Sequence, residues 1–223
     1  EMSRRLTAGD HAGATAAQRR AFEFTLLFAV PFVAAFLTVP DVIMRAMFAR
    51  GAFSAADAAA AGATLAAYAV GLLPFVLIRS AVATFYARKD TATPVKASLT
   101  GIAVNLLLKV ALMGSLAQVG LALATAIGAW VNLLLVLGFA IRAGYLELDR
   151  RFGLSLLKFV VAGIVLAVAF WLTVHVAGGY LAQLSAFRDE TMLLLLMITG
   201  VIVYGVVVLA LFGRSGLRAL IRA

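Results

Sequence analysis

Long apolar runs, separated by short polar segments, dominate the chain. Each run is about as long as a helix that crosses the hydrocarbon core of a bilayer, which needs about 20 residues. The six runs cover about residues 24–39, 58–86, 95–113, 119–141, 156–176 and 192–212. None shows the two-residue alternation of a membrane β-strand, whereas an α-helix satisfies its own backbone in lipid. We therefore expect an all-α integral membrane protein with about six transmembrane helices.

Prolines and short connections refine this pattern. Pro31 lies inside the first run, and Pro74 is expected to break the long second run. The third and fourth runs are joined only by residues 114–118, which predicts a tight antiparallel helical hairpin.

Composition supports a membrane protein and narrows the chemistry. Hydrophobic residues are 64% of the chain, charged residues are 13%, and the mean hydropathy is +1.06. A soluble domain is about half apolar and a quarter charged. The chain has no cysteine, so disulfides and thiolate metal sites are excluded. Residues 1–20 are polar and basic, which is unlike a signal peptide, and because the sequence begins with Glu1 we expect a fragment.

Lysine and arginine are unequally divided between the two ends of the predicted helices. One side holds Arg4, Arg5, Arg19, Arg20, Arg88, Lys89, Lys96, Arg142, Arg150, Arg151, Lys158, Arg214, Arg218 and Arg222, whereas the other holds Arg45, Arg50 and Arg188 near acidic residues. The positive-inside rule places the first side, and both termini, in the cytoplasm. Topology and anionic lipid therefore explain the net charge of +9 better than nucleic-acid binding does.

Two cations lie deep in apolar sequence. Arg79 follows Pro74 in the second run, and Lys109 lies in the third run. A lone cation inside a membrane is costly and normally faces a bundle interior or a wet cavity, which favours a site for an anionic or polar substrate. Both side chains are also near enough to a helix end to snorkel to the headgroups. Both readings stay open at this stage.

A polar cluster is expected beside Lys109. Asn105 precedes Lys109 by four residues, so the two share a helical face. In the next run Gly120, Ala124, Gly128 and Asn132 repeat every four residues, with Thr125 beside them. Such stripes mostly serve close helix packing. The short hairpin also allows a small site made of Asn105, Lys109 and Thr125.

Catalytic motifs are weak. The segment Gly213-Arg214-Ser215-Gly216 matches a pattern of intramembrane serine proteases, but it follows the last run, where a helix end explains it better. His175 lies near the outer end of the fifth run beside Trp171 and Tyr180, as in an interfacial aromatic belt. No metal-binding spacing, P-loop or dinucleotide fingerprint is present, so we expect no catalytic residue, metal or cofactor.

One loop carries a specific resemblance. The segment Phe85-Tyr86-Ala87-Arg88-Lys89-Asp90-Thr91-Ala92-Thr93-Pro94-Val95-Lys96 is very similar to the signature loop of the MurJ (MviN) lipid II flippases, in which Arg88, Lys89, Asp90, Thr93 and Pro94 are the motif residues. Residues 48–54, 67–72 and 120–125 also match that family. The resemblance covers essentially the whole chain and implies the last six of fourteen spans.

The resemblance implies a function and a division of the chain. It implies transport of an undecaprenyl-diphosphate-linked peptidoglycan precursor, lipid II, from the inner to the outer leaflet of the bacterial cytoplasmic membrane, with lipid II and membrane lipids as partners. Arg79 would supply a cation to the diphosphate. The parts would be a cytoplasmic basic segment (1–23), four helices of the transport lobe (24–143), a cytoplasmic linker (144–158), two helices forming a groove for the lipid tail (159–213) and a cytoplasmic tail (214–223).

The resemblance also implies an ion site with one departure. Some members have a sodium site made of an Asn and an Asp four residues apart and a Thr on the following span. The matching positions here are Asn105, Lys109 and Thr125, so that a lysine replaces the acid. Two other functions remain as alternatives: a related exporter of another lipid-linked saccharide or a drug, and an intramembrane hydrolase built on Ser215.

Overall fold

The computed structural model describes residues 9–146, 150–181 and 187–221. These residues form six helices and no strand: α2 (His11–Thr38), α3 (Pro40–Phe48), α4 (Ala55–Tyr86), α5 (Ala92–Arg142), α6 (Arg150–Leu181) and α7 (Arg188–Ile221). Arg4, Arg5, Arg222 and residues 147–149 of the expected linker lie outside the described residues. The expected all-α fold is confirmed.

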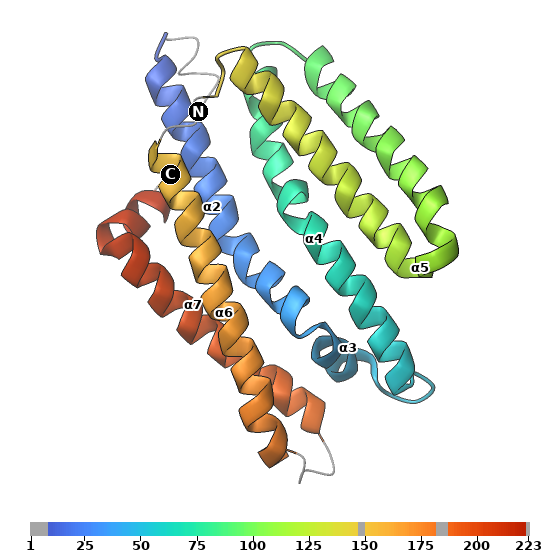
Figure 1. Ribbon diagram of the computed structural model, residues 1–223. Helices are drawn as coiled ribbons and strands as arrows, with labels where there is room; N and C mark the ends of the chain where they lie inside the picture. Colours follow the sequence, from blue (N-terminus) through green and yellow to red (C-terminus); the bar gives the residue numbers. More distant parts are fainter. Residues whose placement is uncertain (1–8, 147–149, 182–186, 222–223) are drawn as a thin grey trace.

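Helix α5 contains the predicted hairpin. Its backbone leaves helical geometry at Ala117, with φ of 47° and ψ of −128°, and the chain reverses there (Figure 1). The two halves run antiparallel in close contact, since a Cβ placed on Gly128 would lie 2.7 Å from the Cβ of Asn105. Five of the described helices are long and apolar enough to cross a membrane. Because α5 crosses twice, they supply the six predicted spans.

Two helices begin earlier than their apolar runs. Helix α2 begins at His11, inside the expected basic segment, and α6 begins at Arg150, inside the expected linker. The side chain of Asp10 accepts a hydrogen bond from the backbone N–H of Gly13 and so caps α2. With 28 residues, α2 is about 42 Å long. A membrane helix can extend past the hydrocarbon core, so the apolar run underestimates its length.

Helix α2 is central to the bundle. It packs against α4 on one side and α6 on the other, α5 covers α4, and α7 covers α6 (Figure 1). The short helix α3 begins at Pro40, which suits a first helical turn, and it contacts α4 and α7. The α4–α5 connection, the end of α5 and the start of α6 lie at one end of the bundle, whereas α3, the α5 turn and the start of α7 lie at the other (Figure 1). The helix ends are therefore grouped as the charge pattern predicted.

Ion pairs join the acidic and basic residues at the second end. The Nε of Arg45 lies 3.3 Å from a carboxylate oxygen of Asp189, and Arg50 lies 3.4 Å from Glu190. These pairs connect α3 and the segment just after it to the first turn of α7. They are partly exposed, so each contributes only about 0–1 kcal/mol to stability.

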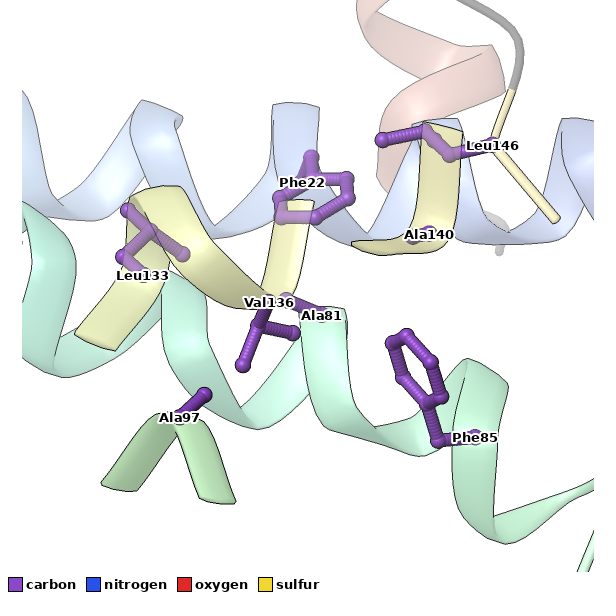
Figure 2. Close-up of a cluster of buried hydrophobic side chains, with 8 residues drawn as sticks. All are labelled: Phe22, Ala81, Phe85, Ala97, Leu133, Val136, Ala140 and Leu146. Atoms are coloured by element: carbon purple, nitrogen blue, oxygen red, sulfur yellow. The ribbon is translucent and has the colours of Figure 1, made fainter. Parts of the chain in front are cut away.

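A core of small and aromatic side chains fixes α2, α4 and both halves of α5 at the first end. Figure 2 shows its buried members: Phe22, Ala81, Phe85, Ala97, Leu133, Val136, Ala140 and Leu146. Alanines let the helix backbones approach closely, and the two phenylalanines fill the remaining space. Large apolar residues on the outside stay exposed, as with Val110 at 76% and Val201 at 77%. That exposure suits a surface covered by lipid.

Candidate functional site

A polar cavity of about 220 Å³ lies between α4 and the two halves of α5. Its polar side chains are Ser98 and Asn105 from the first half of α5 and Thr125 and Asn132 from the second. Pro74 of α4 lines it too. Gly101 and Gly128 bring the two half-helices so close that side chains from both reach one space.

Free acceptor oxygens characterise this cavity. The Oδ1 atom of Asn132 is buried and has no hydrogen-bond partner among the described residues. The hydroxyl of Thr125 donates to the carbonyl of Leu121, which leaves its lone pairs available as acceptors. The cavity is therefore suited to a water molecule or another small hydrogen-bond donor.

The structure brings together two of the three residues of the expected polar cluster. Asn105 and Thr125 line the cavity, whereas Lys109 does not. Lys109 lies one turn beyond Asn105 and is partly buried. None of the described lining residues is acidic. Hard cations favour charged oxygen ligands, and an ammonium one turn away repels them, so these residues do not fit a bound sodium ion.

Two lining residues were missed from sequence. Asn132 ends the four-residue stripe that was interpreted as a packing surface, and Ser98 lies one turn before Gly101 on the seam of the hairpin. Ser98 could have been found from its spacing, because it precedes Asn105 by seven residues on the same helix face. Asn132 lies on the other half of α5, so its position beside Asn105 depends on how the two halves pair across Ala117.

Arg79 does not line the cavity, although Ile78 before it and Phe75 one turn earlier do. It is exposed on α4 and lies in a stripe with three exposed aromatic residues, Tyr68, Phe75 and Tyr86. Spacings of seven, four and seven residues along this stripe place all four on one helix face. The described helices leave this face uncovered. Arg79 and Lys109 are thus not brought into one site.

A second cavity, of about 360 Å³, is almost entirely apolar. We call it the apolar groove. Helix α7 forms one wall with Leu196, Met197, Gly200, Val201 and Tyr204, and α2 forms the other with Pro31, Phe32 and Ala35. Helix α6 contributes Phe170, and Ile43 of α3 lies at one end. The sequence predicted a lipid-tail groove from residues 159–213, and that prediction stays untested; α2 and α3 supply much of the lining of the apolar groove.

The residues of the signature loop hold the α4–α5 connection. Asp90 accepts a hydrogen bond of 3.0 Å from the backbone N–H of Thr93, and Pro94 occupies the first turn of α5. Arg88 donates to the carbonyl of Thr84 and lies 4.2 Å above the ring of Tyr145, which anchors the loop to the far end of α5. Lys89 has a positive φ of 61° in the turn.

The charge of Asp90 makes this loop sensitive to acid. The hydrogen bond from the backbone N–H of Thr93, together with one from its side chain, holds the pKa of the Asp90 carboxyl below its ordinary value. The lowered pKa means that ionised Asp90 stabilises the folded loop at neutral pH. This contribution is lost as the pH falls from the ordinary pKa through the lowered one.

The hydrolase motif is not assembled. Gly213 has a φ of 70° and interrupts α7, and the helix resumes after it. His175 lies near the opposite end of the bundle, where its Nδ1 is 2.9 Å from the carbonyl oxygen of Trp171 and its ring stacks on that indole. Among the described residues no group of three or more His, Asp or Glu side chains is placed to hold a metal.

These features define the class of the chain: a multi-pass α-helical membrane protein. The family model described as "Lipid II flippase MurJ" matches residues 1–211. Probable lipid II flippases MurJ from Rhizobium meliloti and Rickettsia prowazekii are 36% identical over 174 residues and 28% identical over 204 residues, covering 78% and 92% of this chain. The chain belongs to the MurJ family of lipid II flippases.

Structural comparison supports the fold. A solved structure described as lipid II flippase MurJ in an inward closed conformation matches 99% of the chain with a TM-score of 0.75 and 21% identity. The chain spans only 42% of that structure and 32% and 40% of the two relatives above. It therefore corresponds to a part of these proteins.

Proposed function

We propose that the chain is the C-terminal lobe of a flippase that moves lipid II from the inner to the outer leaflet of the bacterial cytoplasmic membrane by alternating access. The observation that carries this proposal is the family match over residues 1–211. The all-helical bundle and its match to a solved flippase support it. In this proposal the protein moves its substrate without breaking a covalent bond.

The apolar groove suits the lipid tail. Its wall residues are almost all hydrocarbon, and it lies between α2 and α7, which both present apolar residues to lipid. An isoprenoid chain could enter it from the bilayer without desolvating any polar group. We assign the lipid tail to this groove. The division of the chain into a four-helix part and a two-helix part belongs to the same proposal.

Arg79 suits the headgroup. A guanidinium binds phosphate oxygens with two parallel hydrogen bonds. The uncovered face of α4 is where the rest of a larger transporter would meet this lobe. We assign both termini and the signature loop to the cytoplasmic side, from the lysine and arginine asymmetry.

The groove provides the test. Ala35→Trp places an indole inside the groove, whereas Leu37→Trp places one on the exposed face of the same helix. Each full-length variant would replace the native protein in a depleted strain, and lipid II in the outer leaflet would be measured with an enzyme that cannot cross the membrane. We expect loss of external lipid II with Ala35→Trp only.

Two outcomes would contradict the proposal. Full external lipid II in the Ala35→Trp variant, at equal membrane abundance, would exclude the groove as the path of the tail. Normal external lipid II in the depleted strain without any complementing protein, together with loss of another lipid-linked saccharide, would instead favour the related exporter.

A further inference from the structure

Each of the two prolines inside a span leaves a backbone carbonyl without its helical partner. Proline has no N–H, so the carbonyl four residues earlier receives no hydrogen bond within the helix. Pro31 in α2 frees the carbonyl of Leu27, and Pro74 in α4 frees that of Val70. In a lipid environment such an orphaned carbonyl is destabilising unless another donor reaches it.

Both freed carbonyls receive an aromatic donor from a neighbouring helix. The hydroxyl of Tyr204 in α7 donates to the carbonyl of Leu27 over 2.8 Å. The indole Nε1–H of Trp130 in α5 donates to the carbonyl of Val70, also over 2.8 Å. The two arrangements involve different helices, different prolines and different donor chemistry, yet each donor meets the one carbonyl that its proline released.

Both proline sites border the two cavities. Pro31 and Tyr204 line the apolar groove from opposite walls, and the hydrogen bond from Tyr204 to the carbonyl of Leu27, one turn before Pro31, joins α2 to α7. Pro74 lines the polar cavity, and Trp130 joins α4 to the second half of α5 beside it. A proline without a backbone hydrogen bond is where a helix bends most easily.

We propose that Tyr204 and Trp130 act as clasps, by which we mean hydrogen-bond donors that fix α2 and α4 to their neighbours at Pro31 and Pro74. By doing so they set the width of the adjacent cavities. Each clasp satisfies the freed carbonyl only while the two helices stay together. Separation of α2 from α7 therefore requires the Tyr204 hydrogen bond to open. The link to transport rests on the proposed function, whereas the clasp itself does not.

The experiment is a double-mutant cycle in the full-length protein. Tyr204→Phe keeps the ring and removes the donor, so the Leu27 carbonyl loses its partner. We expect the apparent Tm in detergent to fall by about 5 °C. Pro31→Ala supplies a backbone N–H that can pair with Leu27. Adding Tyr204→Phe to Pro31→Ala should then lower the Tm by less than half as much. Trp130→Phe and Pro74→Ala form the matched cycle.

The cycle separates a clasp from simple packing. A packing role predicts the same Tm change for Tyr204→Phe with either residue at position 31, and that result would overturn the proposal. An unchanged Tm for Tyr204→Phe in the native background would overturn it as well. Neither double-mutant cycle depends on transport, because both measure only the Tm. A protein that shows a smaller Tm loss in the Pro31→Ala background but does not move lipid II would therefore refute the proposed function and leave the clasp intact.

Groove width needs a second readout. Spin labels on the exposed positions Phe28 of α2 and Ile202 of α7 would report the separation of the two helices. We expect Tyr204→Phe to lengthen or broaden the measured distance distribution. An identical distribution in the native and Tyr204→Phe proteins would overturn the assignment of groove width to the clasp.

Discussion

The seam inside α5 gives a prediction of defined size, Gly128→Ala. A Cβ at position 128 would lie 2.7 Å from the Cβ of Asn105 and 2.8 Å from the carbonyl oxygen of Gly101. The second neighbour is backbone, so the half-helices must separate by several tenths of an ångström. Such overpacking costs about 1–3 kcal/mol. The better helix propensity of alanine returns about 0.5–1 kcal/mol, so the net loss lies in the range of about 0–2.5 kcal/mol and is centred near 1 kcal/mol.

A control on the same half-helix isolates the clash. Gly138 has no atom within 4 Å of an added Cβ, so Gly138→Ala keeps the gain in helix propensity without the steric cost. Unfolding would be followed in detergent by size-exclusion chromatography after heating. A loss of 1 kcal/mol corresponds to a fall in Tm of about 2–4 °C for a protein of this size.

The expected order is therefore Gly138→Ala at or above the native Tm and Gly128→Ala below it by several degrees. Equal Tm values for the two variants would show that the halves of α5 do not meet at Gly128. That result would also remove the basis for the polar cavity, because its lining depends on this contact.

Three further predictions concern the proposed transport and topology. Arg79→Ala should reduce flipping more than Arg79→Lys, and full complementation by the alanine variant at equal abundance would exclude a transport role. In intact cells an impermeant thiol reagent should label a single cysteine placed at Gln118 but not one placed at Asp90. Labelling at position 90 alone would contradict the predicted topology. The rate of flipping in proteoliposomes should depend on an imposed membrane potential and not on sodium, since Lys109 stands where the resemblance implies the acidic residue of a sodium site. A rate that depends on sodium and does not change with the potential would contradict this prediction.

The sequence by itself determined the six spanning helices and which of their ends lie together, but not the starts of α2 and α6 or the separate helix α3. In lipid a spanning segment must satisfy its backbone internally, so an apolar run of sufficient length is already a helix. The turn within residues 114–118 and the division of lysine and arginine between the ends are likewise local features. The expected break at Pro74 was wrong, because α4 runs from Ala55 to Tyr86 through that proline. The resemblance of the loop at Arg88 to Pro94 also needed no tertiary information.

Only the tertiary structure decided which residues share a site. Asn105 and Thr125 meet in a cavity with Ser98 and Asn132, while Lys109 and Arg79 do not line it. The sequence shows which face of one helix a residue occupies, but not the register or rotation of that helix against its neighbour. The donors to the carbonyls of Leu27 and Val70 come from 177 and 60 residues away. The prolines reveal that two acceptors are free, whereas helix packing alone determines that Tyr204 and Trp130 reach them.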